Sequence, residues 1–201
     1  NVGRYGVLRL FDRRSRRVRT FELDGRYADA DVSPSREVLA TVREHDGRRD
    51  LVAIPMMLPE RSHGTRTSAP RLGSPRTLAS EAGTAFSTPR WSMDGTRLVV
   101  ERHRAGQWSD VVVFAWPSGD EVFSASVPGT RVVTPTWRPD GRAVVAAVER
   151  DAVGFDLWEF PLSGPPEARR LTSVDGGALW PDVSPDGNQL AFVSHTATGT
   201  E

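Results

Sequence analysis

A turn motif that recurs at a fixed spacing, with four short apolar runs in each repeat, predicts an all-β protein, a β-propeller of four-stranded antiparallel blades. The motif is most complete in residues 134–142, Thr-Pro-Thr-Trp-Arg-Pro-Asp-Gly-Arg. Ser33, Ser92, Arg138 and Ser184 occupy one position in four copies of it. Arg138 lies 46 residues from both Ser92 and Ser184, whereas Ser33 and Ser92 are 59 apart. The longer interval contains a Pro-, Ser-, Gly- and Arg-rich segment, which we predict to be an insertion.

The apolar runs of each repeat have the length and spacing of short strands. In the third repeat they cover residues 132–138, 143–148, 156–162 and 168–172. The second run of a repeat is apolar at both alternating positions, as in Ala143 to Val148. A strand with one solvated face would alternate instead, so this pattern predicts a strand buried on both faces, as when one blade packs against the next.

The repeat boundaries divide the chain into blades. We expect a half blade in residues 1–25, a blade in 26–83 with a loop insertion at 57–75, blades in 84–129 and 130–175, and a half blade in 176–201. About four blades' worth of strands is therefore present. We expect a fragment of a larger propeller; the alternative is that the two half blades pair and close a ring of four.

The turn itself has the residue preferences of a type I hairpin corner, with Pro at its second position and Gly at its fourth. Its Asp residues are expected to bond to nearby backbone amides, because Asp commonly does so in tight turns, and not to form a ring of catalytic carboxylates. The corner residues that we interpret as structural are Asp94, Gly95, Asp140, Gly141, Asp186 and Gly187.

Two further residues of the motif predict how each blade is placed. A proline precedes the corner in three repeats (Pro89, Pro135 and Pro181). Because proline donates no backbone hydrogen bond, it indicates the start or the free edge of an innermost strand. Trp91 and Trp137 follow these prolines and are expected to pack between blades.

The combination Pro-x-Trp-Ser-Pro-Asp-Gly, an Asp-led strand such as Asp156 to Phe160, and the closing Arg169-Arg170-Leu171-Thr172 resembles the WD-like repeat of TolB-type propellers. It is also similar to repeats in the propeller domains of prolyl-oligopeptidase-type and tricorn-type peptidases. The resemblance implies a protein or peptide partner bound through the loop faces or the central channel, and a periplasmic or cell-envelope location. The first repeat departs from the pattern at Ala30 and Ser35-Arg36, and the second at Met93.

Histidine and carboxylate residues recur at one position after the corner. His103, His195 and Glu149 each lie 11 residues past their repeat marker. Such residue types can bind Mn or Zn. The ends of second strands diverge outward in a propeller, however, so we expect no metal site and no cofactor.

Composition narrows the functional classes. The 201 residues carry a formal net charge of +0 and no Cys, so we expect no nucleic-acid partner and no thiol chemistry. The Arg-rich run from Arg13 to Arg19 is interpreted as a solvated hairpin tip. No apolar run is long enough for a membrane helix, and no nucleophile, zinc-protease or phosphate-loop motif occurs. The sequence thus favours a non-catalytic interaction platform; the alternative is a substrate-gating propeller of a larger peptidase.

Overall fold

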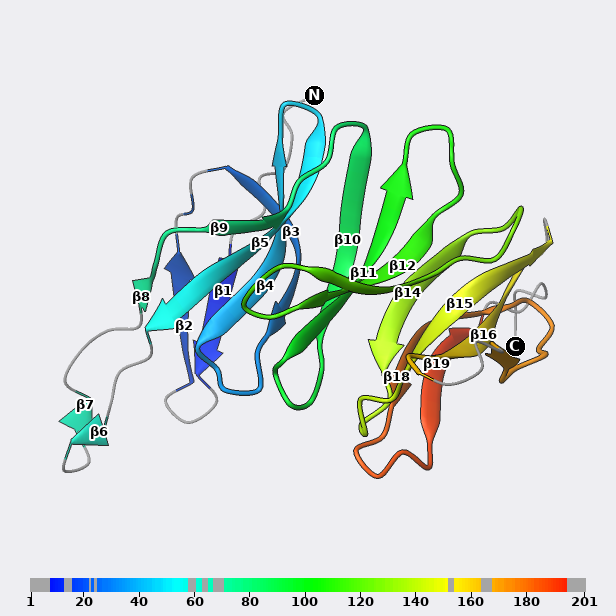
Figure 1. Cartoon of the computed structure of the whole chain (residues 1–201). Helices are drawn as coiled ribbons and strands as arrows, with labels where there is room; N and C mark the ends of the chain where they lie inside the picture. Colours follow the sequence, from blue (N-terminus) through cyan, green and yellow to red (C-terminus); the bar gives the residue numbers. More distant parts are fainter. Residues whose placement is uncertain are drawn as a thin grey trace, which may run out of the picture.

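The computed structural model describes residues 8–12, 16–21, 23, 25–57, 61–62, 65–66, 71–151, 154–163 and 168–194. Every regular element in this part of the chain is a β-strand. The strands form a row of four-stranded antiparallel blades, with a pair of strands at each end of the row (Figure 1). The predicted all-β propeller architecture is therefore confirmed.

Three blades are complete. The first contains β3 (Arg26–Val32), β4 (Val38–His45), β5 (Arg48–Met57) and β9 (Arg76–Ala79). The second contains β10 (Thr84–Trp91), β11 (Arg97–Arg104), β12 (Asp110–Ala115) and β13 (Glu121–Ala125). The third contains β14 (Val132–Trp137), β15 (Ala143–Asp151), β16 (Gly154–Pro161) and β17 (Arg169–Arg170). A single parallel bridge between Ala85 of β10 and Arg49 of β5 joins the first two blades.

The strand pairs at the ends of the row are separate two-stranded sheets. They are β1 (Leu8–Asp12) with β2 (Arg17–Phe21), and β18 (Ala178–Val183) with β19 (Leu190–Ser194). Figure 1 shows these pairs at opposite ends of the molecule. Closing a ring of four blades would require β1 to pair with β19, and the arc of blades does not bring them together. The alternative of four-blade closure is therefore not the arrangement of this structure.

The predicted insertion follows β5. Within its described residues, β8 (Arg71–Leu72) pairs with the end of β5 at Met56 and Met57. A further short pair is formed by β6 (Arg61–Ser62) and β7 (Thr65–Arg66). These segments were expected to be irregular, but backbone pairing to β5 gives part of the segment strand structure.

The core lies between the blades. Val99 and Val113 of the second blade pack against Trp137, Val144 and Phe160 of the third. An equivalent cluster joins the first and second blades through Val42, Leu51, Phe86, Val100, Val112 and Phe114. The apolar faces of successive sheets thus exclude water from one another, which is the main stabilising contribution in such a stack.

Second strands are buried on both faces only inside the row. Ala143 to Val148 of β15 are all buried, as the apolar pattern predicted. In β19, Leu190 and Phe192 pack toward the third blade, whereas Val193 is 43% exposed. The difference arises because only one face of the β18–β19 pair packs against a blade in this structure.

No helix in the described residues is long and apolar enough to span a bilayer.

Candidate binding site on the inner strands

The innermost strand of each blade carries one residue in the left-handed backbone region. Asp29, Thr88, Thr134 and Trp180 have φ values of 47°, 48°, 49° and 49°. Each lies four residues before its repeat marker, and the strand register shifts at each of them. Positive φ is costly for β-branched residues such as threonine. Its recurrence at one position indicates a β-bulge that belongs to the blade and aims these side chains toward the axis.

The strands that carry Pro135 and Pro181 are edge strands of their sheets, as predicted, and the bulge adds to the explanation of the prolines. Pro89 and Pro135 lie in the middle of β10 and β14, not at a strand start. Each follows a left-handed residue at the register shift. Proline is accommodated there because a bulge leaves the local ladder hydrogen bond unformed.

Three of the four bulges are hydrogen-bonded to the preceding blade. The Thr88 backbone N–H donates to Asp29 Oδ2 at 3.2 Å, and the Thr134 N–H donates to Glu101 Oε2 at 3.3 Å. The Trp180 N–H donates to Thr134 Oγ1 at 3.3 Å. Side-chain acceptors therefore tie the inner strands β10, β14 and β18 to the blade that precedes each of them.

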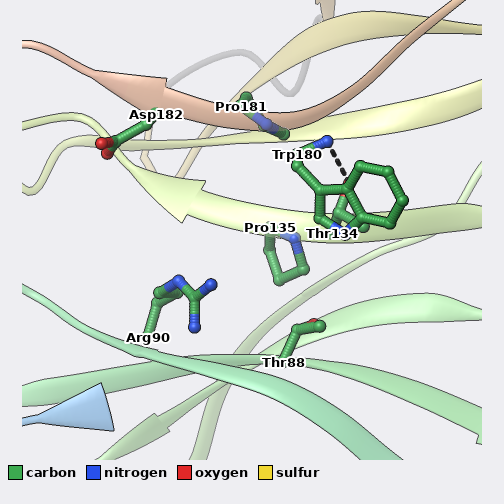
Figure 2. A pocket seen from close by; sticks show the side chains of 7 residues that line it. All are labelled: Thr88, Arg90, Thr134, Pro135, Trp180, Pro181 and Asp182. Atoms are coloured by element: carbon green, nitrogen blue, oxygen red, sulfur yellow. Dashed lines mark hydrogen bonds between the residues drawn. The ribbon is translucent and has the colours of Figure 1, made fainter. Parts of the chain in front are cut away.

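The inner strands of three successive blades enclose a pocket of about 210 Å³ (Figure 2). Residues of β10, β14 and β18 line it: Thr88, Arg90, Thr134, Pro135, Trp180, Pro181 and Asp182. In Figure 2 the Trp180 ring forms one side, with the Pro135 ring beside it, and Arg90 and Thr88 lie opposite. Trp180 is 53% exposed, so a large aromatic surface remains available to a ligand.

The charges in and near this pocket are of both signs. Arg90 is half-buried and Asp182 is exposed. Behind Arg90, Asp31 accepts the backbone N–H of Trp91 at 2.7 Å. Burial raises the pKa of Asp31, while the Trp91 hydrogen bond and the nearby Arg90 charge oppose that rise. The pocket therefore offers a cation and an anion on separate strands beside an aromatic ring.

Next to this site, Glu101 is an acidic residue at a position where the other repeats have apolar residues. Nine residues after their markers, the other repeats have Val42, Ala147 and Val193. Burial raises the pKa of Glu101, although the hydrogen bond from the Thr134 N–H favours its charged form. Glu101 therefore places a partly buried carboxylate, bonded to the Thr134 bulge, at a position that is apolar in the other repeats.

The corner aspartates lie in turns, away from this pocket. Asp94 accepts the Ser92 hydroxyl at 2.6 Å and the Thr96 N–H at 3.0 Å, and the Ser92 bond is the main cause of its lowered pKa. Asp140 and Asp186 accept the backbone N–H groups two residues further on. The adjoining Gly95, Gly141 and Gly187 have φ near +70°. These contacts close the hairpin locally.

The structure describes two of the three histidine and carboxylate candidates, His103 and Glu149. His103 is exposed on β11, and Glu149 on β15 binds Arg131 at 2.9 Å. Hydrogen bonding from Arg131 lowers the pKa of Glu149. His195 lies outside the described residues. Among the described side chains, no group of three or more His, Cys, Asp or Glu could hold a metal ion.

The tryptophans of the motif link neighbouring blades, as expected. Trp91 Nε1–H donates to Asp31 O at 3.2 Å, and Trp137 Nε1–H donates to Arg90 O at 2.9 Å. Each ring thus reaches the inner strand of the preceding blade. Trp137 fixes the backbone of Arg90, a pocket residue, so motif and pocket are coupled.

Sequence reasoning did not identify the pocket. The usable signal was the dipeptide formed by Thr88-Pro89, Thr134-Pro135 and Trp180-Pro181 at the same repeat position. A residue before proline is restricted toward extended backbone, so nothing local indicates a left-handed bulge.

Solved structures of other proteins share the fold of this chain. Neither protein-family models nor curated proteins give a match to the sequence. Among solved structures, a TolB-like protein from Agrobacterium tumefaciens matches with a TM-score of 0.66 and 22% identity, covering 86% of this chain and 56% of that one. TolB from Acinetobacter baumannii matches with a TM-score of 0.69 and 17% identity, covering 96% and 44%.

A third similar structure is a tricorn protease, with a TM-score of 0.62 and 11% identity, covering 96% of this chain and 21% of that one. The chain therefore spans about half the length of the TolB structures and a smaller part of the protease. Its fold is that of the TolB-like β-propellers, which also occurs in propeller domains of peptidases.

Proposed function

We propose that this chain is a non-catalytic interaction module that binds a protein or peptide at the inner strands of its blades. The observation that carries the proposal is the pocket between β10, β14 and β18, with its exposed Trp180 ring. Exposed aromatic surface in a concave, rigidly supported site is typical of binding sites.

The surrounding structure supports a rigid site. Three separate inner strands supply the lining residues, and interblade hydrogen bonds from Trp137 and Trp180 fix two of these strands to the preceding blade. A partner bound there would meet side chains whose positions are already set, so little conformational entropy would be lost on binding. We also propose, by resemblance to TolB, that the protein acts in the periplasm or cell envelope.

A photo-crosslinking experiment tests this function. A photoreactive phenylalanine analogue placed at Trp180 is expected to crosslink to one envelope protein or peptide in a bacterial extract. The same analogue at Val122, which is 53% exposed on the outer strand β13, is the matched control. Equal crosslinking yields and products at both positions would contradict the proposal.

The second candidate is a substrate-gating propeller in a larger peptidase, favoured by the similarity to a tricorn protease. A Gly-x-Ser-x-Gly domain encoded next to this segment would favour gating. In that case, substitutions at Trp180 should alter cleavage of long peptides more than cleavage of dipeptides.

A further inference from the structure

Arg90 has donors that the structure leaves available in the pocket. Its Nη1 donates to the neighbouring Pro89 O at 2.9 Å, and its charge acts on the nearby Asp31 carboxylate, but among the described residues no ion pair within 4 Å joins it to a carboxylate. Other half-buried arginines differ: Arg138, for example, binds Glu159 at 3.1 Å. A guanidinium that retains free N–H groups beside a concave surface is well suited to receive a carboxylate in two parallel hydrogen bonds.

Thr88 supplies a second available group. Its Oγ1 is buried and has no hydrogen-bond partner within the described part of the chain. By contrast, Thr134 Oγ1, at the same repeat position, accepts the N–H of Trp180. By the same repeat relation, Thr88 Oγ1 would accept the backbone N–H of Thr134. That N–H donates to Glu101 instead. Leaving a buried hydroxyl unpaired is costly, and a ligand acceptor would remove that cost.

The remaining lining combines apolar rings with the polar side chains of Thr134 and Asp182. Figure 2 shows the Trp180 and Pro135 rings next to the space that Arg90 and Thr88 border. The carboxylate of Asp182 also lines the pocket and points away from the Trp180 ring (Figure 2). An anionic ligand is therefore attracted on one side and repelled weakly on the other, while an adjoining apolar residue has rings to pack against.

We propose that the pocket binds a peptide carboxylate: the Arg90 guanidinium and the Thr88 hydroxyl donate to its oxygens, and the Trp180 and Pro135 rings contact the residue beside it. This inference rests on the proposed function and names the chemistry of its partner. The carboxylate is either a chain terminus or an acidic side chain, and the test separates the two.

Three dye-labelled tripeptides serve as probes in fluorescence anisotropy with the whole chain. One is Gly-Trp-Pro with a free carboxyl terminus, the second is its amide, and the third is Asp-Trp-Pro amide. The free acid or the Asp peptide is expected to bind about 10-fold more tightly than the Gly-Trp-Pro amide, the gain of one charge-assisted contact. Preference for the free acid indicates a terminus, and preference for the Asp peptide indicates a side chain.

Arg90→Gln and Thr88→Val are expected to remove this preference without lowering affinity for the amide. Val keeps the β-branched shape of Thr88 and removes only the hydroxyl, so a folding defect in one variant leaves the other informative. Asp182→Asn should strengthen binding of the acidic probe. Arg142→Gln changes an exposed corner arginine outside the pocket and is the matched control.

Equal affinity for acid and amide probes, no binding of any probe, or a preference that survives Arg90→Gln would overturn the carboxylate site. If crosslinking at position 180 still identified a partner, the proposed function would stand without it. If the acid preference held but no protein or peptide crosslinked, the proposed function would fail and the carboxylate site would remain.

Discussion

The first blade differs from the second and third blades in how it neutralises an aspartate on its third strand. Each third strand has an aspartate near its start, which is buried in the first and third blades (Asp50 and Asp156) and mostly buried in the second (Asp110). The residue twelve positions after the repeat marker lies close to this aspartate. It is His45 in the first blade, Arg104 in the second and Arg150 in the third. His45 Nε2 lies 2.6 Å from Asp50 Oδ2, whereas Asp50 Oδ1 is buried without a hydrogen-bond partner among the described residues.

The second and third blades neutralise the aspartate more completely. Arg102 forms two bonds to Asp110, at 3.0 and 2.6 Å, and a third to Glu121 at 2.6 Å. Arg170 and Arg150 lie 2.7 and 3.5 Å from Asp156. A guanidinium is always charged, whereas an imidazole is charged only when protonated. The comparison therefore teaches that the first blade pairs its aspartate through one imidazole nitrogen, whereas the other two blades surround theirs with guanidinium groups.

The largest expected effect is loss of the Arg102 guanidinium. Burial opposes the charge of Arg102, but its bonds to Asp110 and Glu121 prevail and raise its pKa above the ordinary value. Arg102→Ala would leave the mostly buried Asp110 without its main partner and is expected to lower the free energy of unfolding by about 3 kcal/mol. Urea denaturation measures this change.

Arg104→Ala is the matched control, since Arg104 is more exposed and lies 3.6 Å from Asp110. Its loss is expected to cost about 1 kcal/mol or less. Similar costs for the two variants would mean that the Arg102 network does not distinguish the second blade.

The next largest effect is expected from giving the first blade the arginine that the second and third blades have at the position of His45. His45→Arg is expected to raise the free energy of unfolding by about 1 kcal/mol at pH 8, because a permanent charge then faces Asp50. Urea denaturation of the variant and the wild type at pH 8 measures the difference.

Other charges face His45 as well: Asp46 lies 3.8 Å away, and Glu44, Arg26, Arg48 and Arg49 border the same surface hollow. His103→Arg, at an exposed position one repeat away, controls for a general effect of added charge. No gain from His45→Arg, or an equal gain from His103→Arg, would contradict this account of the first blade.

The smallest effect concerns Glu101, the carboxylate that only the second blade has at its position. Because burial raises its pKa in the folded state, the folded chain holds this proton to higher pH than the unfolded chain does. Stability therefore falls as pH rises from the unfolded to the folded pKa of Glu101, and the loss is complete above the latter.

Glu101→Gln removes that loss and keeps an amide oxygen for the Thr134 N–H. The variant is expected to be slightly more stable than wild type at pH 7, by less than the gain from His45→Arg, and to lose this advantage in acid. Thermal unfolding at pH 7 and pH 4 provides the measurement. A variant less stable than wild type at pH 7 would show that the Thr134 hydrogen bond outweighs the cost of burial.

The sequence by itself determined the local features and their repetition. The corner at Pro139-Asp140-Gly141, the strands that follow it and the interblade role of Trp137 depend on turn chemistry and side-chain size, which act within a few residues. Equal spacing of these features was sufficient to predict the propeller architecture, because a unit that cannot bury its apolar faces alone must stack on its copies.

The binding pocket, in contrast, exists only in the tertiary structure. Arg90, Pro135 and Trp180 are about one repeat apart in sequence, and only stacking of the blades brings their strands around one pocket. The left-handed conformation of Thr88 and Thr134 opposes the preference of a residue before proline, so it is imposed by interblade hydrogen bonds and packing, not by local sequence. For the same reason the spare donors of Arg90 and Thr88 emerged only once their neighbours in space were known.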